Sequence, residues 1–430
     1  YLQAGPSFVV HPPLGKWLIG VGEAMFGVNS LGWRFMACVF GALLVGMTMR
    51  LARRVSRSTL VGVIAGLLLT FDGLAFTMSR IALLDIFQAF FVVAGVAAVV
   101  ADRDWFRNRL ADQLTALGAS DLDGRFGRLA LWRPWRWVAG LSLGLATSTK
   151  WSGLFFLAAF GLMTVWWDMG ARRAAGVRRW GLGAVLKDGP FAALAMVGTT
   201  AVVYVASWIG WFRSDVGYHR QWNTFHPGEG VMWLPPVLRN WVKYHQDAFA
   251  FNTTLQTPHP YQSDPWTWIL QLRPTSFYYE SPTRGVAGCT VDQCSQAINP
   301  VGTITVWWLG VLALAVVVWW WLVRRDWRAG AIAAGIVGGY LPWFAFADRT
   351  IYAFYAVAFE PWVVLAVTFV IALFVGRRED DPQRWRTRWF IVGGYLLLTL
   401  AMFAFFHPIY VGETIPYDHW RWRMWLPSWI

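Results

Sequence analysis

Five basic side chains stand beside apolar runs in this sequence, where a charge is costly to keep. They are Lys16, Arg34, Arg80, Lys150 and Arg349. An ionisable side chain near or inside a membrane span is expensive unless it is paired or hydrated, so such residues are candidates for function. Guanidinium groups match phosphate oxygens two at a time, and an ammonium adds a point charge. Together the five cations predict a cage for an anion.

Four carboxylates accompany these cations: Asp72, Asp85, Asp348 and Glu360. A purely structural alternative is that Asp72 and Asp85 pair with Arg80 and Lys150 and only hold a helix bundle together. The five cations outnumber the three carboxylates expected on the same side of the membrane, which leaves positive charge to bind a ligand. Glu360 is expected about nine residues inside the next span.

The composition indicates an integral membrane protein. Hydrophobic residues make up 57% of the 430 residues, charged residues only 14%, and there are 31 tryptophans, which is far from an ordinary soluble domain. Apolar stretches of about 17 to 25 residues can cross a bilayer as helices. We expect spans at about 30–50, 58–78, 81–101, 190–211, 301–323, 329–346, 351–375 and 389–407.

The distribution of positive charge predicts the topology. The formal net charge is +13, and 24 of the 37 basic residues fall in five short segments, at 50–57, 103–136, 172–187, 324–328 and 377–388. Basic residues gather in cytoplasmic loops, so this pattern favours membrane topology over a nucleic-acid partner. The N-terminal 29 residues, segment 212–300 and the C-terminal tail are then expected outside the cytoplasm.

The apolar run at 137–169 is too long for one span and contains Lys150. Since both of its flanks are basic, it is expected to go out and return as two short helices, with Lys150 near the outer turn. This gives about ten crossings. The chain then starts outside, so at least one further crossing is expected to precede Tyr1 in the native protein.

This topology divides the chain into three parts. Residues 1–211 form an N-terminal membrane core with an outer-surface helix at 13–28, residues 212–300 an extracytoplasmic cap, and residues 301–430 the C-terminal spans and tail. Aromatic and amide-rich stretches in the cap suit sugar rings or extended peptide. Its four histidines are spaced by 7, 19 and 14 residues, which matches no compact ligand pattern, so no metal is predicted.

Cys289 and Cys294 share the stretch "GCTVDQCSQ" of the cap. An oxidising exterior permits a disulfide between them, and two free thiols are the alternative.

Five motifs, in order, carry a resemblance to a known family. They are "HPPLGKWL", "GWRFMACVFGALL", "FDGLAFTMSRIALLD", "GLSLGLATSTKWSGLF" and "LPWFAFADRTIYAFYAVAFEP". The set closely resembles the protein O-mannosyltransferases, in the actinobacterial form that lacks the extra lumenal domain of the fungal enzymes. The resemblance implies an all-α polytopic membrane protein with the GT-C glycosyltransferase fold.

The resemblance also implies an activity: inverting transfer of mannose from a polyprenyl phosphate to Ser or Thr hydroxyls of exported proteins, at the outer face of the cell membrane. Acceptors are expected to meet the enzyme during Sec-type export. No cofactor is implied, because the lipid carries its own activation. A second lipid-linked sugar transferase, acting on a lipid or envelope glycan, is the alternative. A transporter is less favoured, because its polar residues would lie at the bilayer midplane.

Site residues follow from the same resemblance. In this family an Asp-Glu pair stands in the first outer loop, upstream of the "HPPLGK" stretch, and its Asp is the proposed base; the residues before Pro12 contain no such pair. Fungal members have an acidic residue where Val10 stands. Arg34 is expected to stabilise the departing phosphate. The residues expected to bind substrate are His11, Lys16, Asp72, Arg80, Asp85, Lys150, Arg349 and Glu360.

Overall fold

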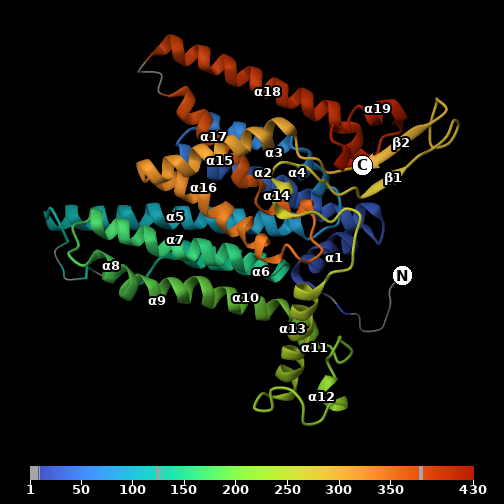
Figure 1. Ribbon diagram of the computed structural model, residues 1–430. Coiled ribbons are helices and arrows are strands. Elements are labelled where there is room, and N and C mark those ends of the chain that lie inside the picture. The colour runs from blue at the N-terminus through green and yellow to red at the C-terminus, as the bar shows by residue number, and fades with distance from the viewer. Residues whose placement is uncertain (1–7, 9, 123, 125, 128, 377–380) are drawn as a thin grey trace.

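The computed structural model describes the chain except for residues 1–7, 9, 123, 125, 128 and 377–380. Long helices lie side by side, with their axes running across the view of Figure 1. The N-terminal elements are α1 (Leu14–Phe26), α2 (Ser30–Ser56), α3 (Thr59–Thr70), α4 (Gly73–Met78), α5 (Asp85–Leu117), α6 (Pro134–Thr149) and α7 (Gly153–Ala174). The central element is α5, because its apolar membrane-spanning part is 83% buried by the rest of the chain.

A continuous helical run follows, made of α8 (Trp180–Gly183), η1 (Ala184–Asp188), α9 (Gly189–Ala192), η2 (Ala193–Gly198) and α10 (Thr199–Ser207). Next come α11 (Ile209–Arg213), α12 (Trp222–Phe225), α13 (Pro236–Thr254) and α14 (Pro265–Trp268). The C-terminal elements are α15 (Ile304–Arg324), α16 (Trp327–Gly339), η3 (Leu341–Phe346), η4 (Ala353–Ala358), α17 (Glu360–Val375), α18 (Pro382–Val411), α19 (Tyr417–Arg421) and η5 (Pro427–Trp429).

Seven helical stretches in the described part of the chain are long and apolar enough to cross a membrane. They are Ser30–Ser56, Asp85–Leu117, Gly153–Ala174, Trp180–Ser207, Ile304–Arg324, Trp327–Phe346 and Pro382–Val411. Thr59–Thr70 and Glu360–Val375 are shorter apolar helices. The run at 137–169 forms two helices, α6 and α7, with Lys150 between them, as the charge pattern predicts. The total of about ten crossings stays a prediction.

Polar residues and prolines interrupt two of the expected spans. Asp72 ends the first part of span 58–78, because its side chain caps α4 by accepting the Leu74 amide at 2.9 Å. Span 351–375 begins with η4, and α17 starts only at Glu360, with Pro361 in its first turn. The position expected for Glu360, about nine residues inside a helical span, is therefore wrong. Proline fits a first turn because its missing N–H would be unpaired there anyway.

The outer-surface helix expected at 13–28 is α1, which follows Pro12 and Pro13. Two glycines allow it to lie flush on its neighbours. A Cβ on Gly15 would come within 2.7 Å of Leu84, and one on Gly22 would come within 2.2 Å of the Gly32 carbonyl of α2. A Cβ on Gly15 would also come within 3.1 Å of Thr149 at the end of α6, so the N-terminal end of α1, with His11 before it, lies beside the α6–α7 turn.

Segment 212–300 is not one cap but two separate parts (Figure 1). Helices α12 and α13 form an arm that projects sideways from the bundle, whereas β1 (Tyr278–Glu280) and β2 (Cys294–Ile298) form a hairpin elsewhere on the same end. β2 also pairs with β3 (Ile415–Pro416) in a three-stranded antiparallel sheet of order β1-β2-β3. This small sheet accompanies a chain that is otherwise helical, as the sequence predicts.

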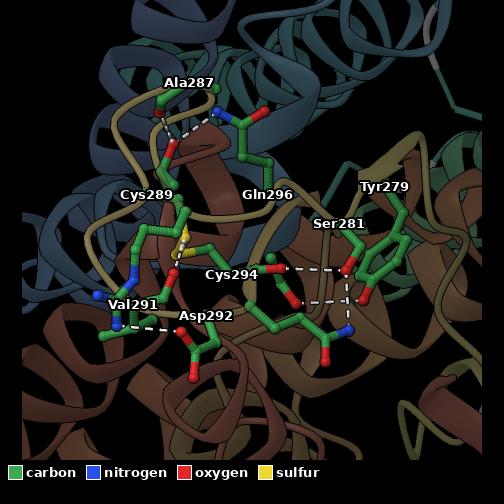
Figure 2. The surroundings of a disulfide bond; sticks show 12 residues. Tyr279, Ser281, Ala287, Cys289, Val291, Asp292, Cys294 and Gln296 are labelled. Carbon is green, nitrogen blue, oxygen red and sulfur yellow. Dashed lines mark hydrogen bonds and ion pairs between the residues drawn. A yellow bond between two sulfur atoms is a disulfide. The ribbon is translucent and has the colours of Figure 1, made fainter.

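The hairpin is closed by a disulfide between Cys289 and Cys294 (Figure 2). Its strands pair in the register Tyr278 with Ile298 and Glu280 with Gln296. The Thr414 hydroxyl links the hairpin to the C-terminal segment, since it donates to the Ala287 carbonyl at 2.8 Å and accepts from the Gln296 amide at 2.7 Å.

Candidate functional site

A cavity of about 260 Å³ lies where the segment before α1, the α6–α7 turn, α13 and the η3–η4 segment meet. Its polar lining includes His11, Lys150, Ser152, Asn252 and Arg349. The remaining lining residues are mainly aromatic or aliphatic: Val10, Trp151, Leu154, Phe155, Phe249, Thr253, Trp343, Phe346 and Tyr355. The site thus combines a few convergent polar groups with apolar walls, the usual character of a ligand cavity.

Lys150 is held in place by contacts from two directions. Its Nζ donates to Asp85 Oδ1 at 2.8 Å and lies 4.2 Å from the centre of the Tyr355 ring. Both members of the ion pair are nearly buried, with side-chain exposures of 7% for Lys150 and 5% for Asp85. Asp85 opens α5 and Lys150 ends α6, so the pair joins two helices and leaves little net charge on its own.

Arg349 lines the same cavity from the η3–η4 segment. It makes no ion pair within the described residues, and its Nε is buried without a hydrogen-bond partner. The segment around it is fixed by its backbone: the Thr350 amide donates to Leu255 at 3.0 Å, and the Ser263 amide donates to Ile351 at 2.9 Å. A buried donor without a partner costs free energy, so the site holds a positive group ready for an acceptor.

His11 is largely buried and lies among positively charged side chains. Burial, together with the charges of Lys150, Lys16 and Arg349, lowers the pKa of His11 to about 3. Lys16 stands on α1, and partial burial lowers its pKa as well. Among these groups only Lys150 has a described carboxylate partner, so the surroundings of His11 carry a surplus of positive charge.

Two of the five cations expected in one cage lie elsewhere. Arg34 is an exposed residue in the first part of α2, which packs against the C-terminal half of α1 at the Gly22–Gly32 contact, whereas His11 precedes the other end of α1. Arg80 donates to the Tyr410 carbonyl at 3.4 Å and lies over the Phe76 ring. Neither lines the cavity. The expected five-cation cage is therefore reduced to Lys150 and Arg349, with Lys16 close by.

Asp72 and Glu360 also lie away from the cavity lining and next to each other, both completely buried. Asp72 accepts the backbone amides of Leu74 at 2.9 Å and Thr303 at 3.0 Å. The pairing of Asp72 with Arg80, considered from the sequence, does not occur; Asp72 instead ties α4 to the start of α15. Glu360 makes no ion pair in the described part of the chain, and its carboxyl group faces that of Asp72.

A hydrogen-bonded chain behind the cavity was not evident in the sequence. Trp151 Nε1 donates to the Tyr204 hydroxyl at 2.8 Å, and this hydroxyl is 2.8 Å from His245 Nε2. His245 Nδ1 is 2.8 Å from the Trp241 carbonyl. Burial lowers the pKa of His245, which fits a neutral ring donating from Nδ1. The chain connects a cavity wall, α10 and the α13 arm, across sequence distances that no local pattern reveals.

A second set of charges lies at the opposite end of the bundle and is fully paired. Arg133 bonds to Asp102 at 2.5 Å and to Asp168 at 2.9 Å. Arg136 joins the same two aspartates. Arg172 pairs with Asp188 at 2.6 Å. These six side chains, at most 3% exposed, are called the inner network below. The sequence placed its three arginines among ordinary loop charges.

Comparisons with known proteins agree with this architecture. Residues 1–172 match the family described as dolichyl-phosphate-mannose-protein mannosyltransferase, and residues 237–429 match the C-terminal four-span region of protein O-mannosyltransferase. The chain belongs to the protein O-mannosyltransferase family. It is 39% identical over 437 residues to the polyprenol-phosphate-mannose--protein mannosyltransferase of Mycolicibacterium smegmatis, covering 99% of this chain and 83% of that protein.

Other members of the family are similarly related. The Mycobacterium tuberculosis protein of the same name is 40% identical, covering 99% of this chain and 82% of that protein. Among solved structures, the S. cerevisiae protein O-mannosyltransferase Pmt1-Pmt2 complex bound to the sugar donor has a TM-score of 0.74 at 13% identity, covering 99% of this chain and 87% of that chain. At this identity the structural likeness establishes a shared fold, the GT-C membrane glycosyltransferase fold expected from the motifs.

Proposed function

We propose that this enzyme transfers mannose from polyprenyl-phosphate mannose to Ser or Thr hydroxyls of proteins. The observation that carries the proposal is the cavity itself, in which Lys150, Arg349 and His11 converge within a chain of this family. Its relatives are named for this donor and for protein acceptors.

The positive groups suit the donor's phosphate. A polyprenyl phosphate leaves with negative charge, and positive donors held in advance stabilise a transition state in which that charge develops. The Lys150–Asp85 pair is nearly neutral, so Arg349 and Lys16 supply the surplus charge. The aromatic and aliphatic walls, such as Phe155 and Phe346, suit the first isoprene units of the lipid.

The orientation is part of the proposal. The elements that line the cavity and the disulfide-closed hairpin lie at the end of the bundle that carries α1 and α13, and the basic loops lie at the other end (Figure 1). Basic loops favour the cytoplasm, and disulfides persist outside it. The active site then faces the exterior of the plasma membrane, where polypeptides emerge during export.

The test is transfer of labelled mannose from polyprenyl-phosphate mannose to a Ser/Thr peptide by the full-length protein in detergent or liposomes. Wild type should transfer, and Arg349→Gln should transfer poorly. Arg34→Gln is the informative companion: comparable loss there would extend the donor site to α2, as the sequence predicts, and near-normal transfer would confine it to the cavity. No transfer to any peptide, with label entering an envelope glycan instead, would favour the alternative lipid-linked transferase.

A further inference from the structure

A large cleft of about 1,070 Å³ is lined by elements at the end of the bundle opposite the elements that line the cavity (Figure 1). It lies between the α2–α3 turn, the α15–α16 turn, the last turns of α17 and the beginning of α18. None of its lining residues belongs to the site described above. It is called the inner cleft below.

Positive charge dominates the polar lining of the inner cleft. Its cations are Arg57, Arg324, Arg325 and Arg328. One carboxylate, Asp326, stands among them and is already engaged, because it pairs with Arg328 at 2.5 Å. Arg57, Arg324 and Arg325 have no ion pair with any carboxylate in the described part of the chain. Three guanidinium groups are thus available to an anion, and guanidinium forks match phosphate oxygens.

The backbone fixes two of these arginines at the cleft. Arg57 ends α2 with φ 56°, and Arg325 ends α15 with φ 51°, both in the left-handed region. This conformation is a common helix ending but is uncommon for residues other than glycine. It reverses the chain directly into the next helix, so both side chains leave from short, defined turns rather than from long loops.

The other walls of the inner cleft are apolar and aromatic. Trp385 and Trp389 of α18 pack edge to face at 6.0 Å, and both line the cleft together with Trp320. Trp389 Nε1 is buried without a hydrogen-bond partner. Leu60 of α3, which is 48% exposed, and Leu365 and Phe369 of α17 continue the apolar wall along the membrane-spanning helices. Tryptophan is typical of the membrane interface, where headgroups and acyl chains meet.

We propose that the inner cleft binds an anionic glycerophospholipid of the cytoplasmic leaflet. Its phosphate lies among Arg57, Arg324 and Arg325, and its acyl chains run along Leu60 and the α17 wall. Basic pockets between membrane helices on the cytoplasmic side favour such headgroups. A soluble anion would use the arginines alone and leave the apolar wall uncovered. The assignment of this lipid to the cytoplasmic leaflet depends on the membrane orientation proposed above.

The test uses the full chain in nanodiscs of phosphatidylcholine, with or without phosphatidylglycerol, and native mass spectrometry to measure retained lipid. Wild type should retain phosphatidylglycerol about 100-fold better than phosphatidylcholine, as three arginines near a headgroup imply. The variant R57Q/R324Q/R325Q should lose this preference. The matched control R107Q/R109Q/R178Q removes three exposed arginines from the same end of the bundle and should keep it. Single variants, each with a loss of about fivefold, replace the triple variant if it does not fold.

Two results overturn the proposal. If the cleft variant and the matched control lost the preference for phosphatidylglycerol equally, the lipid would be attracted by the overall positive charge and not bound at a specific site. Displacement of phosphatidylglycerol by millimolar inorganic phosphate would show that the cleft binds an anion without selecting for a lipid. Retention of lipid requires no turnover, so absence of mannose transfer would contradict the proposed function and leave this inference standing.

Discussion

The cavity and the inner network place buried charge in opposite ways. In the network, Arg133, Arg136 and Arg172 are matched by three aspartates, and each arginine has a carboxylate within hydrogen-bonding distance. In the cavity, Lys150 has a partner but Arg349 has no described carboxylate. A buried charge left unpaired is costly, so a balanced cluster needs nothing further, whereas an unbalanced one favours an incoming anion.

This contrast suggests different roles for the two regions: the inner network holds the helices together, and the cavity binds substrate. The inner network joins α5, α6, α7 and η1, and its loss should affect folding before activity. The cavity joins segments from α1 to η4 and should affect activity before folding. The substitutions below test that division, beginning with the largest expected effect.

Removing one arginine from the inner network should destabilise the protein most. Arg136→Leu leaves Asp102 and Asp168 each short of a donor, and breaking a buried pair from one side typically costs about 3–5 kcal/mol. Unfolding in detergent, followed by circular dichroism, measures the change. The exposed Arg107→Leu on α5 should change stability by less than about 0.5 kcal/mol. If Arg136→Leu proved equally mild, the network would not hold these helices together.

The Lys150–Asp85 pair allows a sharper test, because it combines both roles. Lys150→Gln should lower transfer by about 100-fold, the scale for losing one transition-state donor, and should also destabilise the fold by leaving Asp85 buried and unpaired. The double variant Asp85→Asn/Lys150→Gln should recover stability without recovering transfer. Calorimetry and the mannosyl-transfer assay separate the two. Recovery of transfer in the double variant would make Lys150 a purely structural residue.

The sequence predicts the helical architecture well where it depends on local pattern. The apolar runs and basic segments place most spans, and the two flanks of 137–169 predict the turn at Lys150 that α6 and α7 form. Interruptions were harder to place. The cap at Asp72 and the proline after Glu360 break helices inside apolar runs, and hydropathy alone does not resolve such breaks.

Side-chain partners across the bundle were the least accessible to sequence reasoning. Charge counting placed Arg133, Arg136 and Arg172 in basic segments expected in the cytoplasm and did not predict that each is buried against an aspartate. It also grouped Arg34 and Arg80 with Lys150, because it fixes the depth of a residue in the membrane and not the helix face on which it stands. The family motifs predicted the fold and included Lys150, which lines the cavity. They did not reveal the hydrogen-bonded chain from Trp151 to His245.

Arg349 should affect transfer with little effect on folding. Since it has no described carboxylate partner, Arg349→Gln leaves no buried charge unpaired, and stability should change by less than about 0.5 kcal/mol. Transfer should fall by about 10- to 100-fold, mainly through weaker donor binding, and Arg349→Lys should recover part of it because it keeps the charge but not the fork. A comparison is Arg80→Gln, which loses a contact to Tyr410 outside the cavity. If Arg80→Gln lost transfer and Arg349→Gln did not, the donor site would lie near Arg80 and not in the cavity.

His11 gives the smallest effect and the one most specific to pH. Because the folded protein holds the pKa of His11 at about 3, below the ordinary value of 6.5, the unfolded chain binds a proton between these values that the folded chain does not. His11 therefore stabilises the fold fully above pH 6.5, and this contribution is lost as pH falls from 6.5 toward 3. As pH falls across that range, the free energy of unfolding should decrease more steeply for wild type than for His11→Asn. The difference between the two curves cancels the contribution of the carboxylates, which both proteins share. Parallel curves would mean that His11 titrates normally, which would contradict its burial beside the positive groups of the cavity.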